Sequence, residues 1–133
     1  MNYWLVKTEP GNYSIQNLEK DGTCVWDGVR NYQARNFLMQ MKVGDTALIY
    51  HSVHGKEIVG QSLITSEYYP DPTDESKKFM CVDMKFISKF TKPYSLDMVK
   101  TNPKLSELRL LKQSRLSVMP VSQSEYDEIL KHV

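Results

Sequence analysis

The chain has 133 residues, which suits one domain around a single hydrophobic core, and we expect residues 1–133 to form that domain. Hydrophobic residues make up 41% of the chain and charged residues 25%, which excludes an intrinsically disordered protein. With 17 basic and 16 acidic residues the formal net charge is only +1, so nucleic acid cannot be captured by overall charge and any binding must use a local patch.

The first half of the chain predicts short strands and helices in alternation. Residues 3–7 are apolar and aromatic and precede a Pro-Gly pair, which indicates a strand ending in a turn. Ser14 has the character of a helix N-cap and Gly22 that of a helix stop, so a short helix is expected between them. A brief strand should follow at residues 23–26. Apolar residues at helical spacing then predict an amphipathic helix over residues 31–41.

The middle of the chain predicts a hairpin, a loop and a further strand. Residues 46–50 and 57–65 have strand character and are expected to be neighbours in a hairpin. Two prolines in residues 69–74 remove ladder donors and predict a surface loop. Residues 79–86 alternate between apolar and polar side chains, which gives the clearest strand pattern of the sequence.

The last third predicts mainly short helices. Residues 95–100 and 104–111 have helical character, and residues 115–119 indicate a last strand. A capping box at residues 122–125 predicts a C-terminal helix that runs through Ile129. Five or six short strands with helices inserted between them favour an α+β fold, a small and mostly antiparallel β-barrel, over a parallel sheet.

Cysteine usage and hydropathy indicate the compartment. Cys24 and Cys81 lie far apart without a CxxC partner, which favours two free thiols over a zinc knuckle or a disulfide framework. No basic leader opens the chain, and no window approaches the roughly 18 apolar residues of a membrane span. We therefore expect a cytoplasmic protein, or a nuclear one in a eukaryote, that is monomeric and has no membrane partner.

Residues 26–36 concentrate the side chains that nucleic-acid sites use. They contain two aromatic rings, two asparagines, a glutamine and the arginines Arg30 and Arg35 at a strand-to-helix junction. Such a mixture can stack a base, hydrogen-bond its edge and hold the flanking phosphates, for which the two arginines are the candidates. The same composition is also typical of a core Trp26 beside a solvated helix face.

Motifs for other chemistries are missing from the sequence. It contains no GxGxxG, P-loop, HExxH or GxSxG segment, so no organic cofactor is expected. His51 and His54 are the only paired imidazoles, and without a nearby cysteine their spacing favours loop or hydrogen-bonding roles over a metal site. Arg109, Lys112 and Arg115 form a basic stretch that is more often a solvated face than a phosphate track.

Five segments resemble, in order, the successive motifs of the EVE domain family, and the match runs from residue 3 to residue 130. The segments are residues 4–10, 26–36, 50–52, 69–73 and 115–121. The resemblance implies a PUA-like barrel related to YTH and ASCH domains, with a pocket where YTH domains hold a methylated adenine. It also implies a nucleic-acid partner, DNA or RNA, that carries a modified base such as a 5-substituted cytosine.

When the pocket residues of the family are carried over motif by motif, the resemblance implies which residues of this chain form the base pocket. They are Trp26, Val29, Asn31, Tyr32, His51, Ser52, Ser117 and Pro120, with Lys7 and Glu9 lining or bracing the same cavity. A base that leaves its stack would lie between Trp26 and Tyr32 and be identified by Asn31 and Ser52. A strand at residues 115–119 sets the Ser117 hydroxyl opposite to its neighbours, towards either the pocket or solvent.

Two other functions stay open at this point. ASCH-type relatives include amidohydrolases of acylated cytidine, and Lys7, Thr8 and Glu9 could supply a base, a nucleophile and an acid. Adjacent residues of a strand point to opposite faces, so Lys7 and Glu9 can converge while Thr8 should face away, which counts against that unit. The remaining alternative is a module that binds a small ligand or a protein.

Overall fold

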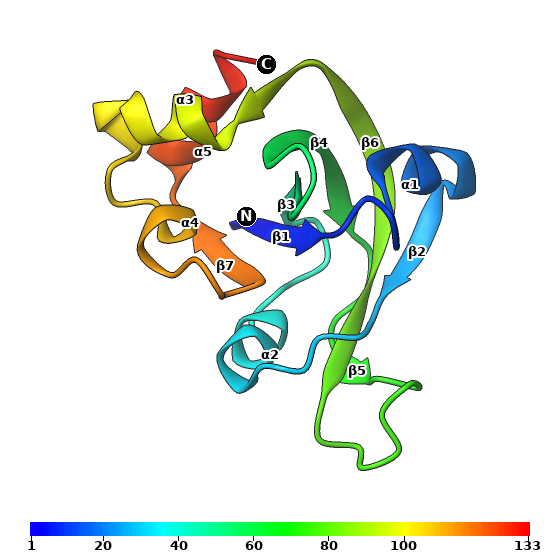
Figure 1. Ribbon diagram of the computed structural model, residues 1–133. Helices are drawn as coiled ribbons and strands as arrows, with labels where there is room; N and C mark the ends of the chain where they lie inside the picture. The colour runs from blue at the N-terminus through cyan, green and yellow to red at the C-terminus, as the bar shows by residue number, and fades with distance from the viewer.

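A curved sheet organises residues 1–133 in the computed structural model (Figure 1). Its strands are β1 (Tyr3–Thr8), β2 (Thr23–Trp26), β3 (Thr46–His51), β4 (Glu57–Ile64), β5 (Tyr69–Pro70), β6 (Met80–Ser95) and β7 (Val118–Val121). The order is β2-β6-β4-β3-β1-β7, and β5 pairs separately with β6. The pair β1–β3 is parallel and the other pairs are antiparallel, which confirms the expected α+β class with a mostly antiparallel sheet.

Short helices surround this sheet. They are α1 (Ile15–Asp21), α2 (Tyr32–Leu38), α3 (Leu96–Thr101), a 3-10 turn (Pro103–Leu105), α4 (Arg109–Lys112) and α5 (Gln123–Leu130). Helices α3, α4 and α5 gather on the side of β7, whereas α1 lies beside β2 and β6 (Figure 1). None of the helices has the length and apolar character needed to cross a lipid bilayer.

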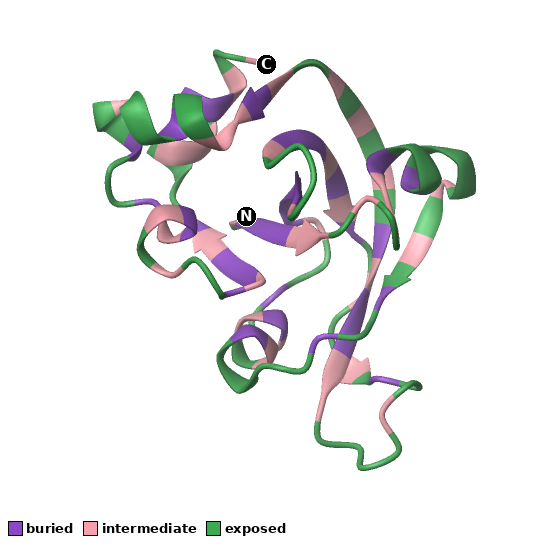
Figure 2. Ribbon diagram, viewed as in Figure 1, coloured by how far each residue is buried: buried purple, intermediate pink, exposed green.

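The core lies inside the curve of the sheet (Figure 2). All six residues of β3 are buried, because β3 lies between β4 and β1 and has helices and loops against it. Leu5, Leu48, Ile58 and Met84 are fully buried and bring four strands into one hydrophobic cluster. Burial of each such side chain stabilises the fold by about 1.5 to 3 kcal/mol.

Bulges in the long strand pairing bend the sheet. The register between β4 and β6 shifts between Ile58 and Gly60 and again between Gln61 and Ser62. Such irregularities raise the local twist, so the sheet curves into a barrel instead of lying flat. No ladder joins β2 to β7, and the barrel is therefore left open between the two ends of the sheet.

Several boundaries differ from those expected from sequence. Helix α2 ends at Leu38, because the chain turns at residues 39–41. Strand β6 continues to Ser95 instead of ending at residue 86, although it contains Pro93. The proline is tolerated because β6 does not pair with β4 between Lys89 and Tyr94. Strand β7 lies three residues later than expected at its start, at Val118–Val121.

The stretch expected as a surface loop at residues 69–74 is only partly one. Tyr69 and Pro70 form β5, which pairs with Cys81 and Met80, and Asp71 is 1% exposed. Proline fits there because β5 is a two-residue edge strand. The buried carboxylate of Asp71 accepts hydrogen bonds from Gly28 and Arg30 and so holds the segment between β2 and α2.

Candidate functional site

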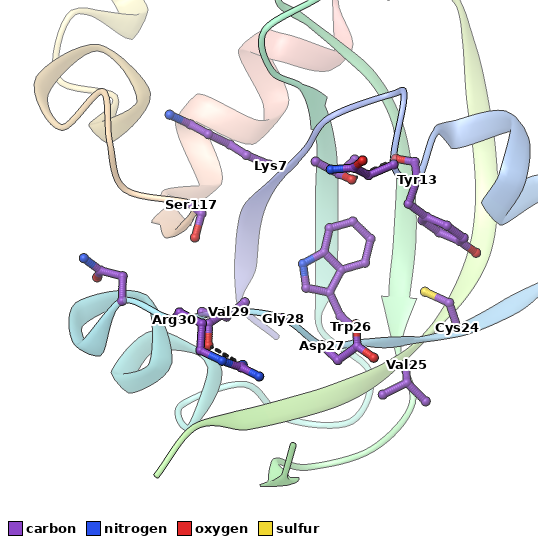
Figure 3. Close-up of a pocket in the computed structure, with 13 residues that line it drawn as sticks. Lys7, Tyr13, Cys24, Val25, Trp26, Asp27, Gly28, Val29, Arg30 and Ser117 are labelled. Carbon is purple, nitrogen blue, oxygen red and sulfur yellow. Dashed lines mark hydrogen bonds between the residues drawn. The ribbon is translucent and has the colours of Figure 1, made fainter. Parts of the chain in front are cut away.

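A cavity of about 780 Å³ opens where the two ends of the curved sheet approach each other (Figure 3). One wall comes from β2 and the segment that leads into α2, and the other comes from the end of β1 and the residue just before β7. We call it the seam cavity. Its lining residues are Lys7, Thr8, Asn12, Tyr13, Cys24, Val25, Trp26, Asp27, Gly28, Val29, Arg30, Asn31 and Ser117. Its volume falls in the range of about 300 to 1,000 Å³ that is usual for small-molecule sites.

Trp26 belongs both to the core and to the cavity wall. It is 7% exposed, and Tyr13 meets it edge-on with ring centroids 6.4 Å apart. Its ring stands between β1 and β2, with Lys7 and Ser117 on one side and Tyr13 and Cys24 on the other (Figure 3). The indole Nε1–H makes no hydrogen bond within the protein, and since no fully buried side-chain nitrogen or oxygen lacks a partner, this N–H is accessible from the cavity. A ligand in the cavity can therefore take up this donor.

Asn31 and Ser117 add two further polar groups to the lining. Asn31 is the N-cap of α2, and its Oδ1 accepts a hydrogen bond from the backbone N–H of Ala34 at 2.9 Å. That bond leaves the Nδ2 amide without a partner in the protein. Ser117 lines the cavity, which answers the question of which way this residue faces, and its hydroxyl is also unpartnered. The wall thus offers an indole N–H, an amide and a hydroxyl.

Lys7 braces the cavity wall and points its charge elsewhere. Its Nζ donates to the carbonyl of Ser114 at 2.7 Å and lies 5.8 Å from the Tyr50 ring centroid. The side chain extends away from Trp26 (Figure 3). Burial lowers the pKa of Lys7. The aliphatic part of the side chain borders the cavity, while the ammonium is held at residue 114.

The segment between β2 and α2 is held by the buried Asp71. The Asp71 carboxylate accepts hydrogen bonds from Gly28 N–H at 2.8 Å, from Arg30 Nη1 at 3.0 Å and from the backbone and hydroxyl of Thr73 at 2.7 and 2.6 Å. Burial by itself would raise the pKa of Asp71, but the hydrogen bonds outweigh it and lower the pKa. Asp71 is therefore a fixed anion that positions the cavity wall.

The placement expected for Tyr32 differs from the structure. Tyr32 is 54% exposed and lies outside the cavity lining. Its ring stacks on Phe79 with centroids 5.0 Å apart, and the Arg35 guanidinium lies over it at 4.8 Å. The first helical turn directs this side chain outwards to the loop after β5, so Tyr32 does not form a wall opposite Trp26.

The two arginines expected to hold phosphates are engaged within the protein. Arg30 is bound to Asp71 and donates to the Thr73 hydroxyl at 2.8 Å. Arg35 donates to the carbonyl of Lys78 at 3.1 Å and also to the Asn36 side chain. Both guanidinium groups fasten the α2 segment to the loop between β5 and β6, which leaves few donors for a ligand.

Three other expected pocket residues also lie outside the lining. His51 Nε2 accepts a hydrogen bond from the N–H of Ile15 at 3.0 Å and so holds the start of α1. Burial lowers the pKa of His51, and Glu57 partly offsets this. Ser52 lines a neighbouring hollow together with Lys7, and Pro120 pairs with Trp4 in the sheet.

The residues considered for an enzymatic unit are not brought together as expected. Glu9 is exposed near Asn12 and does not line the cavity, whereas Thr8 does. The Thr8 hydroxyl donates to the carbonyl of Tyr13 at 2.8 Å. The chain turns after β1, so the strand alternation that would bring Glu9 beside Lys7 does not extend to it. No group of three His, Cys, Asp or Glu side chains is placed to hold a metal ion.

The sequence reasoning missed several lining residues. Tyr13 and Cys24 reach the cavity because α1 and β2 are folded against its rim. The alternation of β2 could have indicated Cys24, since it lies two residues before Trp26 and shares its face. Burial raises the pKa of Cys24 to about 11, so this thiol is a neutral part of the wall.

Comparison with known proteins adds to this geometry. A family model described as EVE domain matches residues 2–132. Thymocyte nuclear protein 1 of Rattus norvegicus is 38% identical over 164 residues, with 97% of this chain and 72% of that protein covered. A crystal structure from Agrobacterium tumefaciens superimposes with a TM-score of 0.95 at 42% identity, covering 98% of this chain and 92% of that one.

Two further solved structures are similar to this chain. Human THYN1 in complex with DNA that contains 5-methylcytosine has a TM-score of 0.90 and 33% identity, covering 98% of this chain and 96% of that chain. An ASCH protein of Zymomonas mobilis has a TM-score of 0.60 at 9% identity, with 98% of each chain covered. At that identity the second likeness shows a shared fold alone.

Proposed function

The chain belongs to the EVE domain family, and from that premise we propose that it reads a modified cytosine in DNA by taking the base into the seam cavity. The observation that carries the proposal is the Trp26 indole, a largely buried ring in the cavity lining whose N–H makes no hydrogen bond within the protein. The structure of human THYN1 with 5-methylcytosine DNA supports DNA as the partner.

The polar groups of the wall suit the edge of a cytosine. Cytosine presents two acceptors, O2 and N3, and the cavity offers donors from Trp26 and from the Nδ2 amide of Asn31. A substituent at C5 would contact apolar wall atoms such as those of Val29. Thymine carries the same methyl group but has an N–H at position 3, so a donor aimed at that position rejects it.

The energies are compatible with a base leaving the double helix. Extrusion of a base costs a few kcal/mol, and stacking on an aromatic ring returns about 1 to 3 kcal/mol. The remainder must come from the edge hydrogen bonds and from phosphate contacts. A buried donor that a wrong base leaves unpaired costs about 1 to 3 kcal/mol, which gives the cavity its means of discrimination.

The proposal describes a binding protein and not an enzyme. The Lys7 ammonium is bound to a carbonyl and Glu9 lies outside the cavity, so the base and the acid considered for an amidohydrolase do not meet in the lining. Incubation with free N-acetylcytidine separates the two functions, because a reader leaves the nucleoside unchanged. Release of cytidine at a rate proportional to protein concentration would contradict the proposal.

Two substitutions that preserve the local structure test the cavity. Trp26→Phe keeps an aromatic wall and removes the N–H, and Asn31→Ser keeps an N-cap oxygen for α2 and removes the amide. Affinities are measured for three duplexes that differ at one position, which carries 5-methylcytosine, cytosine or thymine. We expect Trp26→Phe to weaken 5-methylcytosine binding about 5- to 100-fold and Asn31→Ser to narrow the gap between 5-methylcytosine and thymine.

Tyr32→Leu is the matched control, because Tyr32 lies outside the cavity. It should leave the order of the three affinities unchanged, and thermal melting confirms that each variant is folded. If folded Trp26→Phe and Asn31→Ser proteins both keep the wild-type affinities, the seam cavity is not the base site.

A further inference from the structure

Two cationic side chains outside the motif of residues 26–36 are placed to hold the DNA backbone. Resting on the proposed function, we infer that Arg115 and Lys56 bind the phosphates on either side of the extruded nucleotide. The inference assigns the phosphate contacts to residues that lie far apart in sequence, in two hollows that adjoin the seam cavity and share Ser114.

The basic side chains close to Arg115 already have partners within the protein. Lys112 forms an ion pair with Glu107 at 3.0 Å. Arg109 lies over the Phe37 ring at 5.1 Å and reaches Gln113. With Arg30, Arg35 and Lys7 also engaged, most of the positive charge around the cavity serves the fold. Arg115 and Lys56 are exposed, and their side chains make no hydrogen bond or ion pair.

Arg115 is presented by an anchored turn. The N–H of Leu116 donates to the carbonyl of Gln113 at 3.0 Å, which closes the turn around Arg115. Lys7 holds both of its flanks, through its Nζ to the Ser114 carbonyl and through its backbone N–H to the Ser117 carbonyl at 2.9 Å. The turn is thereby fixed to the strand that lines the cavity, so the Arg115 guanidinium has no partner while the backbone that carries it is held in place.

Lys56 is presented by the loop between β3 and β4 in an unfavourable backbone conformation. Its φ is +46°, and Val53 in the same loop has a φ of +69°. Such values cost about 1 to 3 kcal/mol each and persist where the surroundings impose them. The Lys56 carbonyl accepts from the N–H of Leu96 at 2.8 Å, and Ser52 N–H donates to the Thr8 carbonyl at 2.9 Å. The loop is thus tied to the end of β1 at the cavity.

The hollows that these cations line adjoin the cavity and, through Ser114, each other. Arg115 lines a hollow that shares Asn31 with the seam cavity, and Lys56 lines another that shares Lys7 with it. Neither hollow has an aspartate or glutamate in its lining. In a protein with a net charge of only +1, two adjoining hollows without an acidic side chain fit a polyanion that passes along the edge of the cavity.

The salt dependence of binding tests the inference. Affinity for a short duplex with one 5-methylcytosine is measured over a range of salt concentrations for the wild type, Arg115→Ala, Lys56→Ala and the double variant. Each lost phosphate contact should reduce the slope of log affinity against log salt by about 0.9, and the double variant should lose about 1.8. Arg115→Lys keeps the charge and should keep the slope.

Lys92→Ala is the control, because Lys92 is an exposed lysine that lines none of these hollows. Phosphate contacts are blind to base identity, so the ratio of affinities for methylated and unmethylated duplexes should not change in any variant. A double variant with the slope of Lys92→Ala, or one with a changed ratio, overturns the inference. A wild type that binds DNA without preferring the methylated duplex overturns the proposed function instead.

Discussion

Asn31 illustrates how a single side chain can serve the fold and the site together. Its Oδ1 caps α2 at Ala34, and its Nδ2 is left for the cavity. Replacement by alanine would remove both roles and cost about 1 kcal/mol of stability through the lost cap. The effect on binding would then be mixed with an effect on folding, which is why serine is the informative substitution.

About half of the residues that the sequence predicts for the site line the seam cavity. Trp26, Val29, Asn31, Ser117 and Lys7 line the seam cavity as expected. The other expected residues lie outside the lining, because a sequence motif gives residue types but not the directions in which their side chains point. Tyr32 and His51 carry suitable chemistry, but a stacking partner and a backbone N–H of another element turn them away from the cavity. Those partners lie 36 or more positions away in sequence.

His51 predicts a pH dependence of stability. Its Nε2 must be unprotonated to accept from Ile15 N–H, and its pKa in the folded protein is lowered from 6.5, chiefly by burial. The unfolded chain therefore takes up the proton first as the pH falls. The stabilisation is complete above pH 6.5 and is lost as the pH falls through the lowered pKa.

His51→Gln is the variant that checks this dependence, because an amide oxygen can accept the same bond and does not titrate. Urea unfolding at a series of pH values should show a wild-type free energy that falls below pH 6.5 more steeply than that of the variant. The difference in slope is bounded by about 1.4 kcal/mol per pH unit. The exposed His54→Gln is the control, and parallel curves for His51→Gln and wild type would contradict the assignment.

Local sequence signals determined most of the elements, and tertiary contacts determined their ends. The capping boxes at Ser14 and Ser122 start α1 and α5 where the sequence predicts helices. Strand β6 exceeded its expected length because pairing with β4 extends it through residues of mixed polarity, up to Ser95. A window of a few residues contains no information about a partner strand elsewhere in the chain, so the long curved strand was not foreseen.

Gly60 lies where α1 and β6 both approach strand β4 closely. A Cβ at this position would lie 2.5 Å from the Ser88 carbonyl oxygen and 2.6 Å from Ile15 Cδ1. Since a backbone oxygen of β6 cannot move without disturbing the bulged pairing, Gly60→Ala should lower the free energy of unfolding by about 1 to 3 kcal/mol. Chemical denaturation measures the change.

Gly11→Ala is the matched control for this substitution, because a Cβ there has nothing within 4 Å. Its effect should be small. Equal stabilities of the two variants would show that α1 is less tightly packed on the sheet than the structure indicates.

At the scale of the whole molecule, the open barrel makes ligand binding a contact between the two ends of the sheet. A base in the seam cavity would touch β2 on one side and Ser117, next to β7, on the other. Binding of the base would therefore stabilise only the conformation in which both ends of the sheet are in place. Hydrogen exchange in β2 and β7 should therefore slow together when methylated DNA is added.

The slowing has an expected size. At a DNA concentration 100 times the Kd, openings that destroy the cavity should become about 100-fold rarer, which corresponds to about 2.7 kcal/mol. Helix α5 lines neither the cavity nor the two hollows beside it and serves as the internal reference. Protection confined to β2 would mean that one wall alone holds the base.

The open seam also sets when, during synthesis of the protein, the proposed base site can first form. Its walls join Lys7 and Trp26 to Ser117, so the cavity needs contacts that span most of the polypeptide. Chains grow on the ribosome from the N-terminus, and distant contacts form late in folding. A nascent chain that already contains residues 26–36 still lacks the cavity wall that includes Ser117. Its affinity for a base should therefore appear only after residue 117 has emerged from the ribosome.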